Sequence, residues 1–372
     1  MNKSFDNLKV CVIASDSSGC GNYRVIIPYN NLINRGFKQF KIFTVIPSFD
    51  ILKTYDVIMF QRVEDYNPLP MFYPYYRPLN LMKELKKLGK ILIHEVDDNL
   101  FKVNPSNPCY TQYLPQNEKI HYHKEALLLA DYIHVTNINL KNALIKQLNI
   151  SGDNIYCFDN AIDTKSPYYI NKRHLLPQDK IIIGYQGGST HEDDIKLIVE
   201  PVRHILKKNK NVMFALCSNP HYIKKFGIPK NQTIMIPPES NFNLFLSIPS
   251  MFDIGLVPLQ NNEFNRCKSS LKIHEFAAYK VPTVCSDIDI YRKHYNELKK
   301  DQSITIHDVN MIAKNTKKDW IDSIQKLIDD YAYRSYLGSN AYEMSTNDYS
   351  ESSLCQINNR RIDFYRSLCK SG

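Results

Sequence analysis

Short apolar runs alternate with longer amphipathic stretches along most of this 372-residue chain. The runs are rich in β-branched residues, which is typical of strands buried on both faces of a parallel sheet. They are predicted at residues 9–14, 40–46, 56–60, 90–94, 132–136 and 154–158 in the first half, and at 180–184, 212–217, 233–236, 253–257, 281–285 and 303–306 in the second half.

The segments between the runs predict helices. Residues 80–88, 194–207 and 319–332 have apolar positions at three-to-four spacing. Alternation of strands and helices gives βαβ units, and it occurs twice, on either side of a polar stretch at 164–179. The predicted fold class is α/β, with two Rossmann-like, doubly wound parallel-sheet domains that face each other across a cleft. We expect domains at 1–165 and 166–345, with a C-terminal helix near 346–372 that packs back on the first.

Composition narrows the functional classes only a little. The net charge of +9 favours phosphate-bearing partners, yet it is spread in runs such as 83–90, 207–210 and 292–300, which are also typical of solvated helix faces. The nine cysteines form no CxxC pair, which argues against a zinc or redox site. Their odd number and the length of the chain favour a reducing compartment. The sequence shows no signal peptide and no apolar run of about 18 residues. A cytoplasmic protein is therefore expected, in a bacterium or an infected host cell, with peripheral membrane contact left open.

Ligands of open parallel sheets bind beyond the carboxyl ends of the strands, so the residues just after each strand are the candidates for chemistry. Gly19 and Gly21 follow the first strand and would let the backbone approach an anionic or sugar ligand. The stretch has neither the GxGxxG nor the GK[ST] signature, and an ordinary turn remains an alternative.

The fourth strand is followed by a polar cluster that starts at His94 and includes Asp97. Such groups are costly to bury unpaired, so we expect them at the cleft, contacting substrate. Two alternatives remain: a helix cap by Asp98 or Asn99, and a metal site formed by the carboxylates.

The second half contains two further candidate loops. Gly187, Gly188 and Ser189 follow its first strand, where small residues would let a phosphate or sugar lie against the backbone; the alternative is a plain turn in which Ser189 or Thr190 caps the next helix. Farther along, a polar loop leads into a helix start with free N–H groups and nearby cations, which together suit a pyrophosphate. Its candidate residues are Arg266, Lys268, Ser269, Ser270, Leu271 and Lys272.

Glu275 lies about one and a half turns into that helix, where its carboxylate would accept hydrogen bonds from ribose hydroxyls if the helix end faces the cleft. The alternative is a solvent-exposed glutamate. The stretch 253–286 resembles the nucleotide-binding core of retaining GT-B glycosyltransferases, in particular family four, with Glu275 at the second of two acidic positions spaced by eight. The resemblance implies that Glu275 binds the ribose and that the backbone of 269–272 meets the diphosphate. The first acidic position, which in the family contacts the donor sugar, falls on Cys267.

Other segments match the same family in chain order. GKILIHEVDD resembles the strand that places a histidine, here His94, near the reacting carbon, and NIYCFDNAID resembles the end of the first domain, with Asn160 and Asp163. The resemblance implies transfer of a sugar from a nucleoside diphosphate sugar, with a UDP-sugar as the first candidate. It also implies retention of configuration, no metal ion and no tightly bound cofactor. His94 and Asp97 would orient the acceptor, and Arg266 and Lys268 would stabilise the leaving diphosphate.

The acceptor is left open by the sequence. A surface glycan, a lipid-linked sugar or a protein is one class, and a hydroxymethylated base in phage DNA is the competing one, because the segment SSGCGNYRVIIPYNNL resembles the start of phage-encoded glycosyltransferases. A sugar-nucleotide epimerase and an inactive binding relative are further alternatives. No stable protein partner is predicted.

Overall fold

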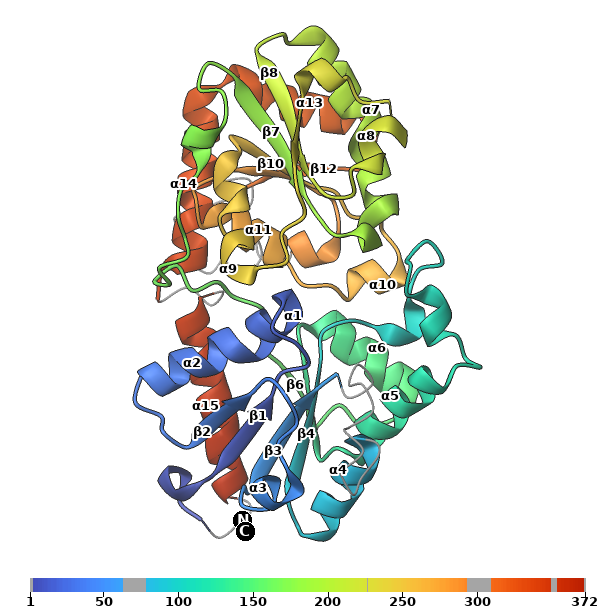
Figure 1. Ribbon diagram of the computed structural model, residues 1–372, viewed down its shortest axis with the longest axis vertical. Helices are drawn as coiled ribbons and strands as arrows, with labels where there is room; N and C mark the ends of the chain where they lie inside the picture. The colour runs from blue at the N-terminus through green and yellow to red at the C-terminus, as the bar shows by residue number, and fades with distance from the viewer. Residues whose placement is uncertain (1–2, 63–77, 226, 293–308, 349–352, 371–372) are drawn as a thin grey trace.

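The computed structural model describes residues 3–62, 78–225, 227–292, 309–348 and 353–370. They form two domains stacked along the long axis of the molecule, each built on a six-stranded parallel sheet with helices against it (Figure 1). The predicted α/β fold class is thereby confirmed. The predicted strand at 303–306 and the charged run that continues to 300 lie outside the described residues.

The N-terminal sheet has the strand order β2-β1-β3-β4-β5-β6. Its core is apolar on both faces, as the uninterrupted β-branched runs predict. The strands are β1 Val10–Ile13, β2 Phe40–Phe43, β3 Val57–Gln61, β4 Ile91–Val96, β5 Tyr132–Val135 and β6 Ile155–Cys157. The helices are α1 Gly19–Gly21, α2 Ile27–Asn34, α3 Phe49–Leu52, α4 Pro78–Lys87, α5 Glu118–Leu129 and α6 Ile138–Leu148.

The C-terminal sheet has the order β12-β11-β10-β7-β8-β9. The strands are β7 Ile181–Gln186, β8 Val212–Cys217, β9 Thr233–Ile236, β10 Ile254–Val257, β11 Thr283–Ser286 and β12 Met311–Ala313. The helices are α7 Glu192–Lys208, α8 His221–Lys225, α9 Phe242–Phe245, α10 Glu263–Arg266, α11 Leu271–Ala277, α13 Lys317–Asp329 and α14 Tyr331–Thr346. The pattern of apolar residues had not predicted the short edge strand β12.

The predicted helix at 319–332 is in fact two helices. The backbone of Asp330 is extended (φ −114°, ψ 91°), so α13 ends at Asp329, and the Asp330 carboxylate caps α14 by accepting from the backbone N–H of Tyr333. The apolar spacing continues across the break, which is why the pattern alone missed it. Among the described residues, no helix is both long and apolar enough to span a bilayer.

The last helix, α15 (Leu354–Lys370), lies against the N-terminal sheet beside α2, although it follows the C-terminal domain in the chain (Figure 1). Tyr365 is fully buried there, and its hydroxyl lies 2.7 Å from that of Tyr29. Phe364 packs on Tyr132 and Tyr156. The chain therefore passes between the two domains twice, once between β6 and β7 and once between α14 and α15.

Candidate active site

A cavity of about 250 Å³ lies between the two domains at the carboxyl ends of both sheets. It is walled by residues from each domain, as expected for doubly wound sheets that face one another. The N-terminal domain contributes Gly19, Cys20, Tyr23, Arg24, Asp97, Asp98 and Asn160. The C-terminal domain contributes Tyr185, Gln186, His191, Phe245, Leu256, Val257, Pro258, Leu259, Lys268, Ser269, Leu271, Lys272, Glu275 and Tyr291.

The glycine loop after β1 is shaped by Asp16. Its carboxylate accepts hydrogen bonds from the Ser18 backbone N–H (2.7 Å), the Gly21 N–H (3.2 Å) and the Ser15 hydroxyl (2.9 Å). Burial favours the protonated acid, but these hydrogen bonds outweigh it and lower the pKa of Asp16. A Cβ on Gly21 would lie 1.8 Å from the Asp16 carbonyl oxygen, so only glycine fits. A Cβ on Gly19 would meet no atom within 4 Å, and this residue lines the cavity.

A π-helical turn follows the loop at Asn22–Ile26, a feature frequent at functional sites. This turn places Arg24 at the wall of the cavity, where the residue is only 2% exposed. Arg24 donates to Glu95 (2.5 Å), to the Phe158 carbonyl (2.5 Å) and to the Asn160 side chain (2.8 Å). Burial, opposed by the charge of Arg24, raises the pKa of Glu95. Asn160 in turn donates to the Ser269 hydroxyl of the other domain (2.9 Å), so this network joins the two walls of the cavity.

Charged side chains also cross the cleft. Arg62 holds Asp97 (2.6 Å) and Asp98 (3.0 Å), and Lys268 reaches Asp98 from the other domain (3.3 Å). Burial alone would raise the pKa of Asp98, but the charges of Lys268 and Arg62 outweigh it and lower that pKa. Lys268 therefore lies with its ammonium group in the cleft, paired with a carboxylate in the ligand-free protein.

Lys272 and Glu275 form the second charged pair, with Lys272 Nζ 2.9 Å from Glu275 Oε2. Glu275 is only 5% exposed yet lines the cavity. The hydroxyls of Tyr23 and Tyr169 are buried nearby. Burial, together with the Glu275 charge, raises the pKa of both tyrosines well above the ordinary value. Phe245 lies below Lys272, whose ammonium is 5.3 Å from the ring centroid.

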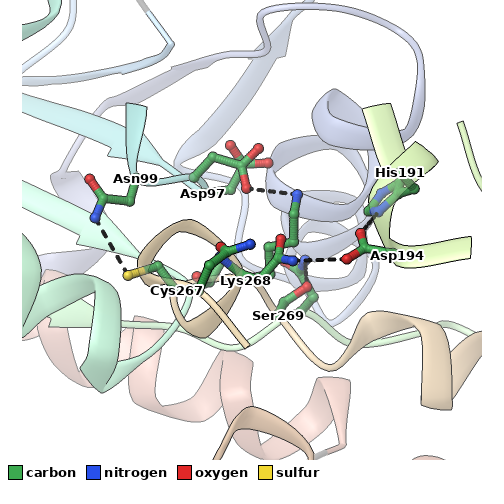
Figure 2. Close-up of polar contacts among 12 residues, drawn as sticks. Asp97, Asn99, His191, Asp194, Cys267, Lys268 and Ser269 are labelled. Atoms are coloured by element: carbon green, nitrogen blue, oxygen red, sulfur yellow. Dashed lines mark hydrogen bonds and ion pairs between the residues drawn. The ribbon is translucent and has the colours of Figure 1, made fainter. Parts of the chain in front are cut away.

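His191 adds an imidazole to the same cavity. Its Nδ1 lies 2.8 Å from Oδ2 of Asp194, a residue in the first turn of α7 (Figure 2). Burial and the charges of Lys268 and Lys272 lower the pKa of His191, and Asp194 opposes them only in part. His191, not Ser189 or Thr190, occupies the N-cap position of α7.

The structure therefore brings together seven of the residues predicted from the sequence. They come from three segments and all line the cavity: Gly19, Asp97, Lys268, Ser269, Leu271, Lys272 and Glu275.

His94 is placed elsewhere. Side chains alternate along β4, so that Glu95 faces Arg24 while His94 faces α5, where its ring packs 5.6 Å from that of His123. It is fully buried and does not line the cavity, so the structure does not bring it together with the other predicted residues.

Arg266 also lies away from the cavity. It is exposed and donates to the Asn261 side chain (2.7 Å), so it does not join the predicted cation cluster. Four further predicted residues likewise do not line the cavity, namely Gly21, Gly187, Gly188 and Ser270, and the side chain of Ser189 lies outside the described part of the structure. In addition, α11 is only seven residues long, so the cationic side chains are a stronger attraction for an anion here than the helix dipole.

Cys267 faces the N-terminal domain. It is buried in the apolar cluster formed by β4, β5 and α6, and the Asn99 amide lies 3.7 Å from its sulfur (Figure 2). The Asn137 side-chain amide donates to the backbone carbonyls of Cys267 (2.9 Å) and Lys268 (3.0 Å). The departure from the family pattern at this position therefore accompanies an interdomain contact.

Sequence reasoning assigned no role to Arg24, to His191 or to its partner Asp194. Asn160 was noted only as a family match. His191 and the acidic residues after it stand at the start of a predicted helix, but the sequence around them does not indicate that they lie beside Lys268. Among the described residues, no group of three or more His, Cys, Asp or Glu side chains is arranged to hold a metal ion.

Comparison with known proteins identifies the architecture. No protein-family model matches the chain, and no curated protein matches it in sequence. Solved structures do match: Anabaena HepE in complex with UDP-glucose superposes with a TM-score of 0.63 at 12% identity, covering 97% of this chain and all of that one. A glycosyltransferase from Rickettsia africae gives 0.63 at 10% identity, covering 98% and 100%. The fold is thus that of GT-B proteins.

A third similar structure is assigned to another class of enzyme. A Listeria monocytogenes protein assigned as a UDP-N-acetylglucosamine 2-epimerase superposes with a TM-score of 0.56 at 12% identity, covering 98% of this chain and 97% of its own. At such identities the likeness defines the fold, and the reaction has to be argued from the cavity itself.

Proposed function

We propose that this protein is a glycosyltransferase that uses a UDP-sugar donor and transfers the sugar to an acceptor hydroxyl. The observation that carries the proposal is the placement of Lys268, Lys272 and Glu275 in one interdomain cavity. The two lysines suit a diphosphate, and the buried carboxylate suits ribose hydroxyls. Proteins of this fold that cover the whole chain bind UDP or UDP-glucose, which supports UDP as the nucleotide.

Each of the two lysines is paired with a carboxylate, Lys268 with Asp98 and Lys272 with Glu275. A bound diphosphate would compete with Asp98 for Lys268 and with Glu275 for Lys272, leaving each carboxylate free to accept from the donor or acceptor. As the bond to the sugar breaks, negative charge grows on the leaving diphosphate, and preorganised cations stabilise it without reorganisation. Asp97 and Asp98, which line the cavity from the N-terminal domain, would orient the acceptor.

We further infer retention of configuration and independence of metal ions, from the resemblance in the 253–286 segment. The preferred acceptor is a surface glycan, lipid or protein, reached by a single hydroxyl, because a cavity of about 250 Å³ admits a small group and not a whole polymer. A hydroxymethylated base in phage DNA is the competing acceptor. The net charge of +9 would suit a phosphate backbone, so binding to DNA that falls steeply with salt would favour it.

A donor panel tests the proposal. Thermal unfolding is measured with nucleoside diphosphates and their sugars; a ligand at 100 times its Kd stabilises by about 2.7 kcal/mol. UDP and one UDP-sugar should raise the Tm of the wild type and of Lys207→Ala, an exposed lysine on α7, and should fail to raise that of Lys272→Ala. An equal shift in Lys272→Ala would show that the donor binds elsewhere.

The epimerase alternative is separated by its product. A transferase slowly hydrolyses its donor in the absence of acceptor and releases UDP with a free sugar, whereas an epimerase returns a new sugar nucleotide and no free UDP. Proton NMR of the wild type with the stabilising UDP-sugar distinguishes the two outcomes. Accumulation of an epimeric sugar nucleotide would refute the transferase assignment.

A further inference from the structure

His191 lines the cavity, and the proposed chemistry assigns no role to its imidazole. The inference below rests on the proposed function, since it concerns how the donor site recognises a diphosphate. The imidazole is hydrogen-bonded to Asp194 in a cavity that already contains two lysines.

The partner of His191 is fixed in place. Asp194 is 4% exposed, and while its Oδ2 meets the His191 Nδ1, its Oδ1 accepts from the Gln260 backbone N–H (2.7 Å) and the Asn265 amide (2.9 Å). All of these contacts are made within the C-terminal domain. With Nδ1 committed to Asp194, Nε2 is the nitrogen available to a ligand, and it has no hydrogen-bond partner among the described residues.

The charges around the ring change sign when a diphosphate arrives. In the free protein the ring faces Asp194 of its own helix, Lys268 and Lys272 from the segment before and within α11, and Asp98 from the other domain. The two lysines and burial disfavour a third positive charge, so the pKa of His191 is lowered and the ring is neutral at pH 7.5. A diphosphate brings two or more negative charges into the same space, and these favour the cation.

We propose that a nucleoside diphosphate binds together with one proton, which His191 takes up at Nε2 and donates as a hydrogen bond to the phosphate. The proton comes from solvent, Nδ1–H remains on Asp194, and the carboxylate balances the imidazolium. Release of the diphosphate returns the proton to solvent. The donor site would then hold a third cation only while it is occupied.

Calorimetry tests this directly. UDP is titrated into the protein at pH 7.5, where its terminal phosphate is already ionised, in buffers of different ionisation enthalpy. The wild type should take up a substantial fraction of one proton per UDP, and its Kd should rise by up to about tenfold per pH unit from pH 7 to 8.5. His191→Gln, which keeps a hydrogen-bonding group at the same reach, should show no uptake. His204→Gln, a matched change at an exposed position of α7, should behave as wild type.

A second variant guards against a purely structural effect. His191→Lys carries its charge throughout this pH range, so it should bind UDP with a Kd that does not change between pH 7 and 8.5. Binding of UDP by the wild type without proton uptake, or equal uptake by His191→Gln, would overturn the inference and leave the donor site intact. Failure of every nucleoside diphosphate to bind the wild type would overturn the proposed function and this inference together.

Discussion

Replacing Glu275 by glutamine gives the most informative single perturbation of the cavity. The two side chains have the same shape, so the change removes the negative charge and leaves the packing around α11 in place. In the structure Oε2 accepts a hydrogen bond from Lys272 at 2.9 Å, and we expect the other carboxylate oxygen, Oε1, to meet the ligand. If that oxygen accepts from a ribose hydroxyl, the variant loses a hydrogen bond to a charged group.

Such a bond is worth about 1.5–3 kcal/mol, so the Kd for UDP should rise by roughly 10- to 150-fold in Glu275→Gln. Calorimetry with UDP, 2′-deoxy-UDP and 3′-deoxy-UDP identifies the hydroxyl. The deoxy ligand that lacks it should bind the wild type weakly, yet should bind the variant about as well as UDP does. Glu200→Gln, an exposed glutamate on α7, serves as the control. Wild-type affinity in Glu275→Gln, or the same deoxy penalty in both proteins, would refute the ribose assignment.

Three further predictions concern stability and metal dependence. Trp320 is fully buried in the core of the C-terminal domain, so Trp320→Ala should lower the free energy of unfolding by about 3–5 kcal/mol in urea titrations. The pKa of Asp16 is lowered in the folded state, so its carboxylate stabilises the fold above the unfolded pKa of about 3.9, and this stabilisation is lost as the pH falls. The difference in unfolding free energy between wild type and Asp16→Asn should therefore shrink between about pH 6 and 3. A difference that stays constant over this range would contradict the prediction. UDP-sugar hydrolysis should persist in EDTA, and its loss would contradict metal independence.

The fold could be predicted from the sequence because each strand carries its own evidence. The apolar runs mark the strands whatever their neighbours are, and eleven of the twelve expected strands have a counterpart among the described residues. The ends were less accurate. β4 continues to Val96 through Glu95, and β7 continues to Gln186, because buried polar side chains near the strand ends find partners that the hydrophobic pattern cannot reveal.

The site was predicted where its residues are neighbours in the chain. Lys268, Lys272 and Glu275 belong to one short segment, so their common position could be inferred from the segment alone. The structure does not bring His94 to the cavity because neighbouring residues of a strand face opposite sides of the sheet, and Glu95 is the residue that faces the Arg24 network. His191 was missed because its significance depends on Lys268, which is distant in sequence and arrives through the arrangement of the sheet.

The double passage of the chain between the domains constrains how the cleft can open. With β6 joined to β7 and α14 joined to α15, the C-terminal domain is topologically an insertion in the other, and two neighbouring tethers permit rotation about the line between them more readily than free separation. Arg366, in the last helix, lies over the ring of Phe5, with its Cζ atom 5.4 Å from the ring centroid, so the first and last described segments of the chain pack together in the N-terminal domain. The distance between fluorescent labels at the two ends of the chain should therefore not change when the cleft opens, whereas the distance between one label on α7 and one on α5 should change.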